Sequence, residues 1–170
     1  PELAEETRRQ LAAFLPREAS LANPGDMIAS ASPDDYRRTL AALLAAPEVD
    51  AVIVIYIPVG LAETDAIAAA IRDGLAEGRR RGGAGKPVYG CLMTERKLHR
   101  GALDFGTETV PCYRFPESAA RALGRVAGYA AWRQSPPGMI PAFPDLDVER
   151  ARRVCRAAVA HLREGWLDAS

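Results

Sequence analysis

Continuous apolar runs alternate along the chain with segments in which apolar residues recur at every third or fourth position. This alternation predicts the fold class. Continuous β-branched runs predict strands buried on both faces of a parallel sheet. Apolar residues at every third or fourth position predict helices that cover such a sheet. The predicted strands span residues 18–22, 51–57, 88–93 and 109–115. The predicted helices span residues 2–14, 32–46, 61–78, 116–133 and 145–167.

The clearest helix boundary lies at Ser32. Its hydroxyl suits an N-cap, and Pro33 suits the first helical position. Asp34 and Asp35 then place two carboxylates where the helix dipole favours negative charge. Because strands and helices alternate with tight turns between them, we expect an open, doubly wound α/β domain with right-handed crossovers.

Composition narrows the class of protein. The chain has 170 residues, 48% of them hydrophobic and 26% charged, which is typical of one globular domain. Its 22 basic and 22 acidic side chains cancel, so we expect neither nucleic acid nor an anionic membrane as a partner. No apolar run approaches the roughly 20 residues of a membrane span. The chain begins with Pro1 and has no signal-peptide pattern, so we expect a cytoplasmic piece of a longer polypeptide.

The side chains that most often carry catalysis or bind metals show no informative spacing. Cys91, Cys112 and Cys155 are far apart, and two of them lie in apolar surroundings, which favours buried thiols in a reducing cytosol. His99 and His161 have no local partner and are more often surface or packing residues. We therefore expect no metal site and no catalytic residue in this chain.

The basic cluster at residues 79–81, with Lys86 nearby, has two interpretations. A solvated helix end is favoured over a binding patch. Gly82 to Lys86 has the composition of a phosphate loop, but it precedes a predicted strand. A phosphate loop follows its strand, so we exclude that interpretation.

The first candidate site is the turn Pro58-Val59-Gly60, between the second predicted strand and a helix. Ligands of open α/β sheets bind outside the carboxyl ends of the strands. A helix N-terminus there offers free N–H groups and partial positive charge to an anion such as phosphate, and Gly60 permits close approach. The alternative is a turn with a structural role only.

The second candidate is the turn Asn23-Pro24-Gly25-Asp26. Asn and Asp side chains in such turns often bind their own backbone, which is the structural interpretation. The functional interpretation places Asp26 at the carboxyl edge of the first predicted strand, beside the turn that contains Gly60. The residues alone leave both interpretations open.

The order of segments resembles a known family. LAAFLP, NPGDM, VDAVIVIYIP, GKPVY and VPCYRFPESAARALGRVAGYAAWR resemble the third domain of nucleoside-diphosphate-forming acyl-CoA synthetases, which include ADP-forming acetate–CoA ligases and their fusions to protein acetyltransferases. The most specific pieces are P-E-S-A-A-R-A-L-x(5)-Y-x-x-W and N-P-x-D. The same domain is similar to the C-terminal domain of the succinyl-CoA synthetase β subunit. The resemblance implies a flavodoxin-like, three-layer α/β/α fold with a mainly parallel sheet.

The resemblance also implies a reaction. The family converts a carboxylic acid, CoA and a nucleoside triphosphate into acyl-CoA, a nucleoside diphosphate and phosphate, through an acyl phosphate and a phosphohistidine. The backbone N–H groups of Gly60, Leu61 and Ala62 would face that phosphohistidine, with Asn23 and Asp26 in the loop beside it. The phosphorylated histidine belongs to another domain and is not transferred to either histidine of this chain.

Further expectations concern the longer enzyme. The domain itself would bind no cofactor, whereas the full-length enzyme would use CoA, ATP or GTP, and Mg. Its partners would be a histidine-bearing domain and an ATP-grasp module, or a second copy in a homo-oligomer. Residues 1–138 would form the flavodoxin-like domain and residues 139–170 a helical connector, and the isolated 170-residue chain would be inactive. The alternative function is a non-catalytic regulatory or scaffolding domain of a CoA-ligase-like or acetyltransferase fusion protein.

Overall fold

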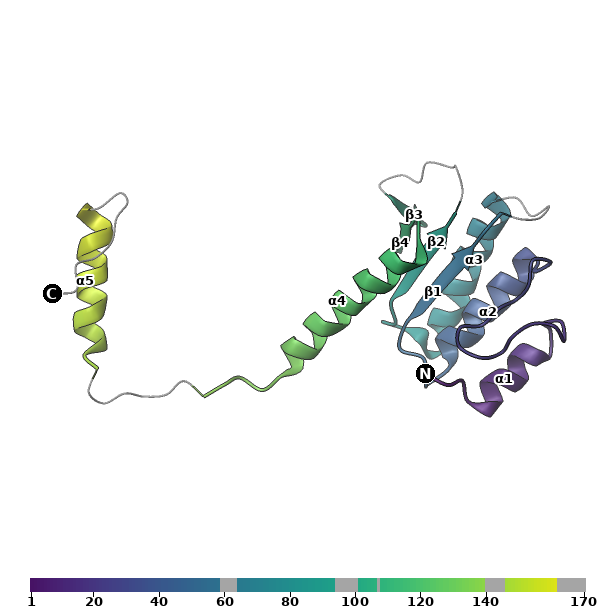
Figure 1. The fold of residues 1–170 in the computed structure, drawn as a ribbon, viewed down its shortest axis with the longest axis horizontal. Helices are drawn as coiled ribbons and strands as arrows, with labels where there is room; N and C mark the ends of the chain where they lie inside the picture. Colours follow the sequence, from purple (N-terminus) through teal and green to yellow (C-terminus); the bar gives the residue numbers. More distant parts are fainter. Residues whose placement is uncertain (59–63, 94–100, 107, 140–145, 162–170) are drawn as a thin grey trace. The chain divides into compact units, whose positions relative to one another are not determined.

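The computed structural model describes residues 1–58, 64–93, 101–106, 108–139 and 146–161. The chain divides into two compact units, Pro1–Arg133 and Gln134–Ser170. The first unit holds a four-stranded sheet with its helices, and the described part of the second contains the helix Val148–His161 (Figure 1).

The sheet has the strand order β1-β2-β4-β3. The strands are β1 (Val52–Tyr56), β2 (Val88–Leu92), β3 (Ala102–Asp104) and β4 (Thr109–Tyr113). β1 runs parallel to β2 with Val52 opposite Val88, β2 runs parallel to β4, and β3 is antiparallel to β4. The expected α/β class with a mainly parallel sheet is confirmed. The short β3 is an addition that the apolar pattern did not predict.

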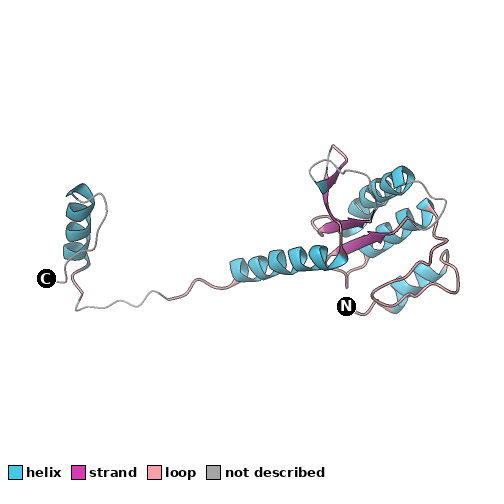
Figure 2. Ribbon diagram, turned by 45° about the horizontal axis from the view of Figure 1, so that its top comes forward, coloured by secondary structure: helices cyan, strands magenta, loops and turns pink. Residues whose placement is uncertain are grey.

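The helices confirm most of the predicted elements. They are α1 (Glu5–Ala12), α2 (Pro33–Ala45), α3 (Thr64–Gly78), α4 (Pro116–Gln134) and α5 (Val148–His161). A short π-helical turn, Arg79–Gly83, follows α3 and contains Gly82 with φ 106°. In Figure 2 the helices α2 and α3 (cyan) lie side by side against the strands (magenta).

The N-terminus of α2 begins as its sequence predicts. The Ser32 hydroxyl accepts a hydrogen bond from Asp35 N at 3.3 Å, and Ser32 N donates to the Asp35 carboxylate at 2.8 Å. This reciprocal capping box satisfies two donors that a helix end otherwise leaves unpaired. It also fixes the residue at which the preceding loop ends.

The helices α2 and α3 pack at very short range because glycine forms part of the contact. A methyl group placed on Gly74 would lie 2.5 Å from the carbonyl oxygen of Arg37. Leu44, Ile67 and Ile71 fill the core around this contact and are almost completely buried. The glycine therefore brings α3 close to α2, and both helices cover one face of the sheet.

The prediction of a strand at residues 18–22 is wrong. The segment forms only one isolated antiparallel bridge, in which Ser20 N donates to Asp26 O at 2.8 Å and Asp26 N donates to Ser20 O at 3.0 Å. The turn of residues 23–25 folds the chain back on itself, so Ser20 pairs locally instead of joining the sheet.

The expectation that residues 51–57 are buried on both faces is also wrong. Val52 and Tyr56 are buried, but Ile55 is 43% and Ile57 48% exposed. Among the described strands, β1 has a neighbour only on the β2 side. The face that carries Ile55 is therefore only partly covered within the first unit.

The exposure on this face arises because most of α4 does not pack against the strands. On the apolar stripe of α4, Ala119 is buried, but Val126 and Tyr129 are 51% and 58% exposed. α4 contacts the body at its first turns, and the rest of the helix extends away from the strands (Figure 1). Helical periodicity identifies the apolar stripe correctly, but no described residue of the first unit covers Val126 or Tyr129 well enough to bury it.

The second unit contains α5. Its N-terminus is capped by Asp147, whose carboxylate accepts a hydrogen bond from Arg150 N at 2.8 Å. The sequence predicts that this helix begins at residue 145, which lies outside the described residues. The division into a domain of residues 1–138 and a connector of residues 139–170 stays a prediction.

Candidate functional site

A pocket of about 890 Å³ lies at the carboxyl end of β1. Its wall combines the loop of residues 25–33, Tyr36 at the start of α2, and residues 55–57 at the end of β1. Open α/β sheets bind ligands at this position, because the loops that follow the strands diverge there. The pocket is therefore the candidate site.

Asp26 lies in the wall of this pocket. One oxygen of its carboxylate accepts a hydrogen bond from Ile28 N at 2.8 Å, so the side chain closes a turn of its own loop. That turn holds Ile28 at φ 60°, a conformation that a β-branched residue rarely adopts. The local fold-back is thus present, and the same residue borders the pocket, so the two interpretations of Asp26 are compatible.

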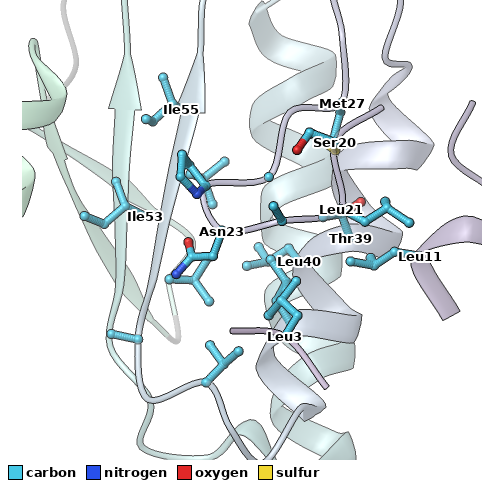
Figure 3. Close-up of a pocket in the computed structure, with 18 of the residues that line it drawn as sticks. Leu3, Leu11, Ser20, Leu21, Asn23, Met27, Thr39, Leu40, Ile53 and Ile55 are labelled. Carbon is cyan, nitrogen blue, oxygen red and sulfur yellow. The ribbon is translucent and has the colours of Figure 1, made fainter. Parts of the chain in front are cut away.

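Asn23 is placed differently. Its side-chain amide donates a hydrogen bond to the carbonyl oxygen of Pro1 at 3.0 Å. It lines a second, apolar cavity of about 430 Å³ beside β1, whereas Asp26 does not (Figure 3). The structure therefore does not bring Asn23 and Asp26 into one cavity, although they are three positions apart in the sequence.

Tyr36 is a pocket residue that the sequence did not identify as a candidate. Its ring meets the ring of Tyr56 edge to face, with centroids 5.8 Å apart. Burial raises the pKa of Tyr36 above its ordinary value, and Tyr56 and Asp26 raise that pKa further. Tyr36 therefore remains a neutral hydroxyl donor at neutral pH. Its position in the first turn after a capped loop is the signal that could have identified it.

The predicted phosphate donors Gly60, Leu61 and Ala62 lie outside the described residues. In the sequence they follow β1, which ends at the pocket, and precede α3. His99 lies outside the described residues as well, and so does the side chain of His161 at the end of α5.

Part of the basic cluster at residues 79–81, with Lys86, has a structural role. Arg79 donates hydrogen bonds to the carboxylate of Glu108 and to the carbonyl oxygen of Lys86. Lys86 donates to the carbonyl oxygen of Ala46 at 2.6 Å. These two cations therefore join the turn after α3 to β4 and to the end of α2, and Arg79 is only 20% exposed rather than solvated.

The three cysteines differ in burial and are all free thiols. Cys91 is fully buried and Cys112 half-buried, and burial raises the pKa of both. Cys155 in α5 is exposed. Two thiols thus lie in protein surroundings, as the sequence indicated.

Metal ligands and membrane spans were also sought in the part of the chain that the structure describes. No group of three or more His, Cys, Asp and Glu side chains there is arranged to hold a metal ion. Among the same residues, no helix has the length and apolar character needed to cross a bilayer.

No protein-family model matches the sequence. The fold itself places the chain in a class, because a mixed α/β domain with a mostly parallel four-stranded sheet matches the flavodoxin-like domain of CoA ligases. The chain is a homologue of the alpha subunit of ADP-forming acetate–CoA ligase. It is 34% identical over 123 residues to subunit alpha of the Pyrococcus furiosus enzyme named acetate–CoA ligase [ADP-forming] II. The match covers 71% of this chain and 26% of that subunit.

Solved structures agree with this relationship. The crystal structure of a Pyrococcus horikoshii protein has a TM-score of 0.56 and 31% identity, covering 71% of this chain and 27% of that one. The apo form of the dinucleotide-forming acetyl-coenzyme A synthetase 1 of Candidatus Korarchaeum cryptofilum has a TM-score of 0.61 and 26% identity, covering 79% of this chain and 30% of that one. A second structure of that synthetase holds phosphate and ADP. This chain thus spans about a quarter to a third of its relatives.

Proposed function

We propose that this chain is one domain of a nucleoside-diphosphate-forming acyl-CoA synthetase. The observation that carries the proposal is the 34% identity over 123 residues to an ADP-forming acetate–CoA ligase subunit, of which the match covers only 26%. The reaction joins a carboxylic acid to CoA at the expense of a nucleoside triphosphate. It passes through an acyl phosphate and a phosphohistidine carried by another domain.

In this proposal the domain offers a helix N-terminus to the phosphohistidine. The donors are the backbone N–H groups of Gly60, Leu61 and Ala62, which precede α3 in the sequence. A helix N-terminus carries partial positive charge and unpaired N–H groups, so it stabilises a phosphoryl group without a cationic side chain. The position of the pocket at the carboxyl end of β1 supports this role.

The loop that contains Asn23 and Asp26 borders the proposed phosphate position. Asp26 lies in the wall of the pocket, and its carboxylate holds the backbone of Ile28. We infer that Asp26 acts by shaping the loop. A second anion would repel a phosphoryl group, which argues against direct binding.

The cofactors belong to the longer enzyme in this proposal. CoA, ATP or GTP, and Mg bind to other domains, and this chain provides contacts to the histidine-bearing domain and the ATP-grasp module. The apolar residues that stay exposed on α4 are suited to such contacts. Tyr129 and Trp132 stack with ring centroids 5.6 Å apart and are 58% and 69% exposed. The free thiols are consistent with a cytoplasmic enzyme.

The helix-end role is tested by Gly60→Pro in the full-length synthetase, with Gly60→Ala as the matched control. Proline removes the N–H of residue 60, whereas alanine keeps it. We expect rapid-quench measurements to show phosphoryl transfer to and from the histidine slowed about tenfold or more in the proline variant. Nucleotide binding should stay unchanged. Equal loss of both properties, or of neither, would contradict the role.

A further inference from the structure

The apolar cavity of about 430 Å³ follows the edge of β1 that faces away from β2 (Figure 3). Leu40 of α2 lines it on one face of the sheet, and Leu123 of α4 lines it on the other. Because residues from both faces contribute, the cavity lies beside the strand rather than above or below it. Its far wall is the segment of residues 20–25 together with Met27.

The backbone of β1 turns polar groups toward this cavity. Val52 N donates to Pro87 O at 3.0 Å, and Tyr56 O accepts from Met93 N at 3.0 Å. Alternate residues of a parallel strand point their N–H and C=O groups to the same neighbour, so Val52, Val54 and Tyr56 face β2. The N–H and C=O groups of Ile53 and Ile55 therefore face the cavity, and no described strand pairs with them there.

The rest of the wall also has unused polar groups. The segment 21–25 makes no backbone–backbone hydrogen bond with any described residue. Thr39 is one of the lining residues, and its hydroxyl is shielded from solvent and has no hydrogen-bond partner among the described residues. Buried backbone and hydroxyl groups are almost always paired in folded proteins. Residues 22–25 are exposed and Ile55 is 43% exposed, so water reaches this edge, and an occupant with its own donors and acceptors would replace that water.

We propose that this cavity accepts an extended polypeptide strand, uncharged and rich in β-branched residues, which pairs with β1 and adds a strand to the sheet. An extended main chain offers donors and acceptors at the spacing of the groups on Ile53 and Ile55. Its side chains alternate between the two faces, where leucines of α2 and α4 form apolar walls. No charged side chain lines the cavity in the described part of the chain, which excludes a charged strand.

The source of the strand is another segment of the same ligase, and this assignment rests on the proposed function. The relatives are three to four times longer than the region they share with this chain, since the matches cover 26% to 30% of them. A ligase of that size has other segments available to complete the edge. The sequence of β1, VIVIY, has none of the charges or prolines with which proteins block an unpaired edge.

Amide hydrogen exchange of the ¹⁵N-labelled 170-residue chain tests the proposal. The probe is the synthetic peptide KKVTIVITVKK, whose uncharged centre VTIVITV is the pairing segment and whose terminal lysines only keep it soluble. Without peptide, the amides of Ile53 and Ile55 should exchange much faster than that of Val54, which pairs with β2. Addition of the peptide should slow exchange at Ile53 and Ile55 by about tenfold or more. Unchanged exchange at saturating peptide concentration would overturn the proposal.

Two controls separate strand pairing from general apolar binding. The same peptide with N-methyl groups on alternate amides should give no protection. Ile55→Pro removes an N–H that does not serve β2, a substitution that edge strands tolerate, and Ile55→Ala keeps that N–H. The alanine variant should retain peptide protection at Ile53 and the proline variant should lose it. Protection by the methylated peptide would show apolar binding only and overturn the strand model.

The source is tested in the full-length ligase. There, Ile53 and Ile55 should be protected without added peptide, because the edge is already occupied. Fast exchange of both amides in the full-length enzyme would overturn the assignment to another ligase segment. Ligase turnover is measured on the same sample, so a preparation that shows protection without turnover would contradict the proposed function and support the strand site.

Discussion

The carboxylate of Glu48, which follows α2, accepts a hydrogen bond from the hydroxyl of Thr7 in α1 at 2.7 Å. The same oxygen accepts from Ala4 N at 2.8 Å. Ala4 is the N-cap position of α1, and no side chain of α1 itself caps this end. Glu48 therefore supplies the missing cap at Ala4 from 44 positions away and fastens α1 to the body of the domain.

This contact makes the attachment of α1 dependent on pH. The hydrogen bonds from Thr7 and Ala4 lower the pKa of Glu48 below its ordinary value of 4.5. A depressed carboxyl pKa stabilises the folded state above the ordinary value, and that contribution is lost as pH falls through the folded pKa. Glu48→Gln should therefore unfold at lower urea concentration than the parent near neutral pH. The two midpoints should converge as pH falls through the folded pKa of Glu48, because both side chains are neutral below that pKa. A constant difference between midpoints across this range would contradict the assignment.

The close contact of α2 and α3 predicts opposite effects for two glycine substitutions. Gly74→Ala places a methyl group 2.5 Å from the carbonyl oxygen of Arg37 and should destabilise the domain by about 1–3 kcal/mol. Gly124→Ala in α4 meets no atom within 4 Å and should stabilise by about 0.5–1 kcal/mol through helix propensity. Urea denaturation of both variants measures the difference. Equal effects of the two changes would mean that α3 does not approach α2 this closely.

Arg79 and Arg81 are two positions apart and should differ in their effect on stability. Arg79→Ala removes hydrogen bonds to Glu108 and to the carbonyl oxygen of Lys86, and should cost about 1.5–3 kcal/mol. Arg81→Ala removes an exposed ion pair with Glu77 at 3.3 Å and should cost about 0.5 kcal/mol or less. Thermal unfolding followed by circular dichroism compares them. A larger loss for Arg81→Ala would refute the ranking.

The three thiols should react with Ellman's reagent at separable rates. Cys155 is exposed and should be modified first. Cys91 is buried with a raised pKa, so its reaction should require unfolding and accelerate with urea. Cys112 should be intermediate, since it is half-buried and its pKa is also raised. Cys155→Ser should remove only the fast phase, and loss of a slow phase instead would contradict the assignment.

The sequence predicts the central elements well because their signals are local. β2 is a short continuous apolar run, and α2 begins at a capping serine, so both appear where their residues place them. The short β3 escaped prediction because three residues with only Leu103 buried leave no readable period. The prediction of a strand at residues 18–22 was wrong because an apolar run carries no information about the segment with which it pairs.

Some residues of the candidate site can be predicted from the sequence, and others cannot. Asp26 is found from its turn-forming neighbours, which are adjacent in the sequence. Tyr36 is not found, because its place in the pocket depends on Tyr56 and on the path of the loop before α2. The exposure of Val126 was likewise unreadable, since a helical stripe shows which side is apolar and not what covers it.

β3 has a consequence for how the sheet is bounded. It is three residues long, runs antiparallel to β4 and ends in Asp104, whose carboxylate accepts a hydrogen bond from Gly106 N at 2.9 Å. Very short strands with a charge at the edge resist further pairing. The β3 edge of the sheet is thus closed to further pairing, so a new strand can be added only beside β1.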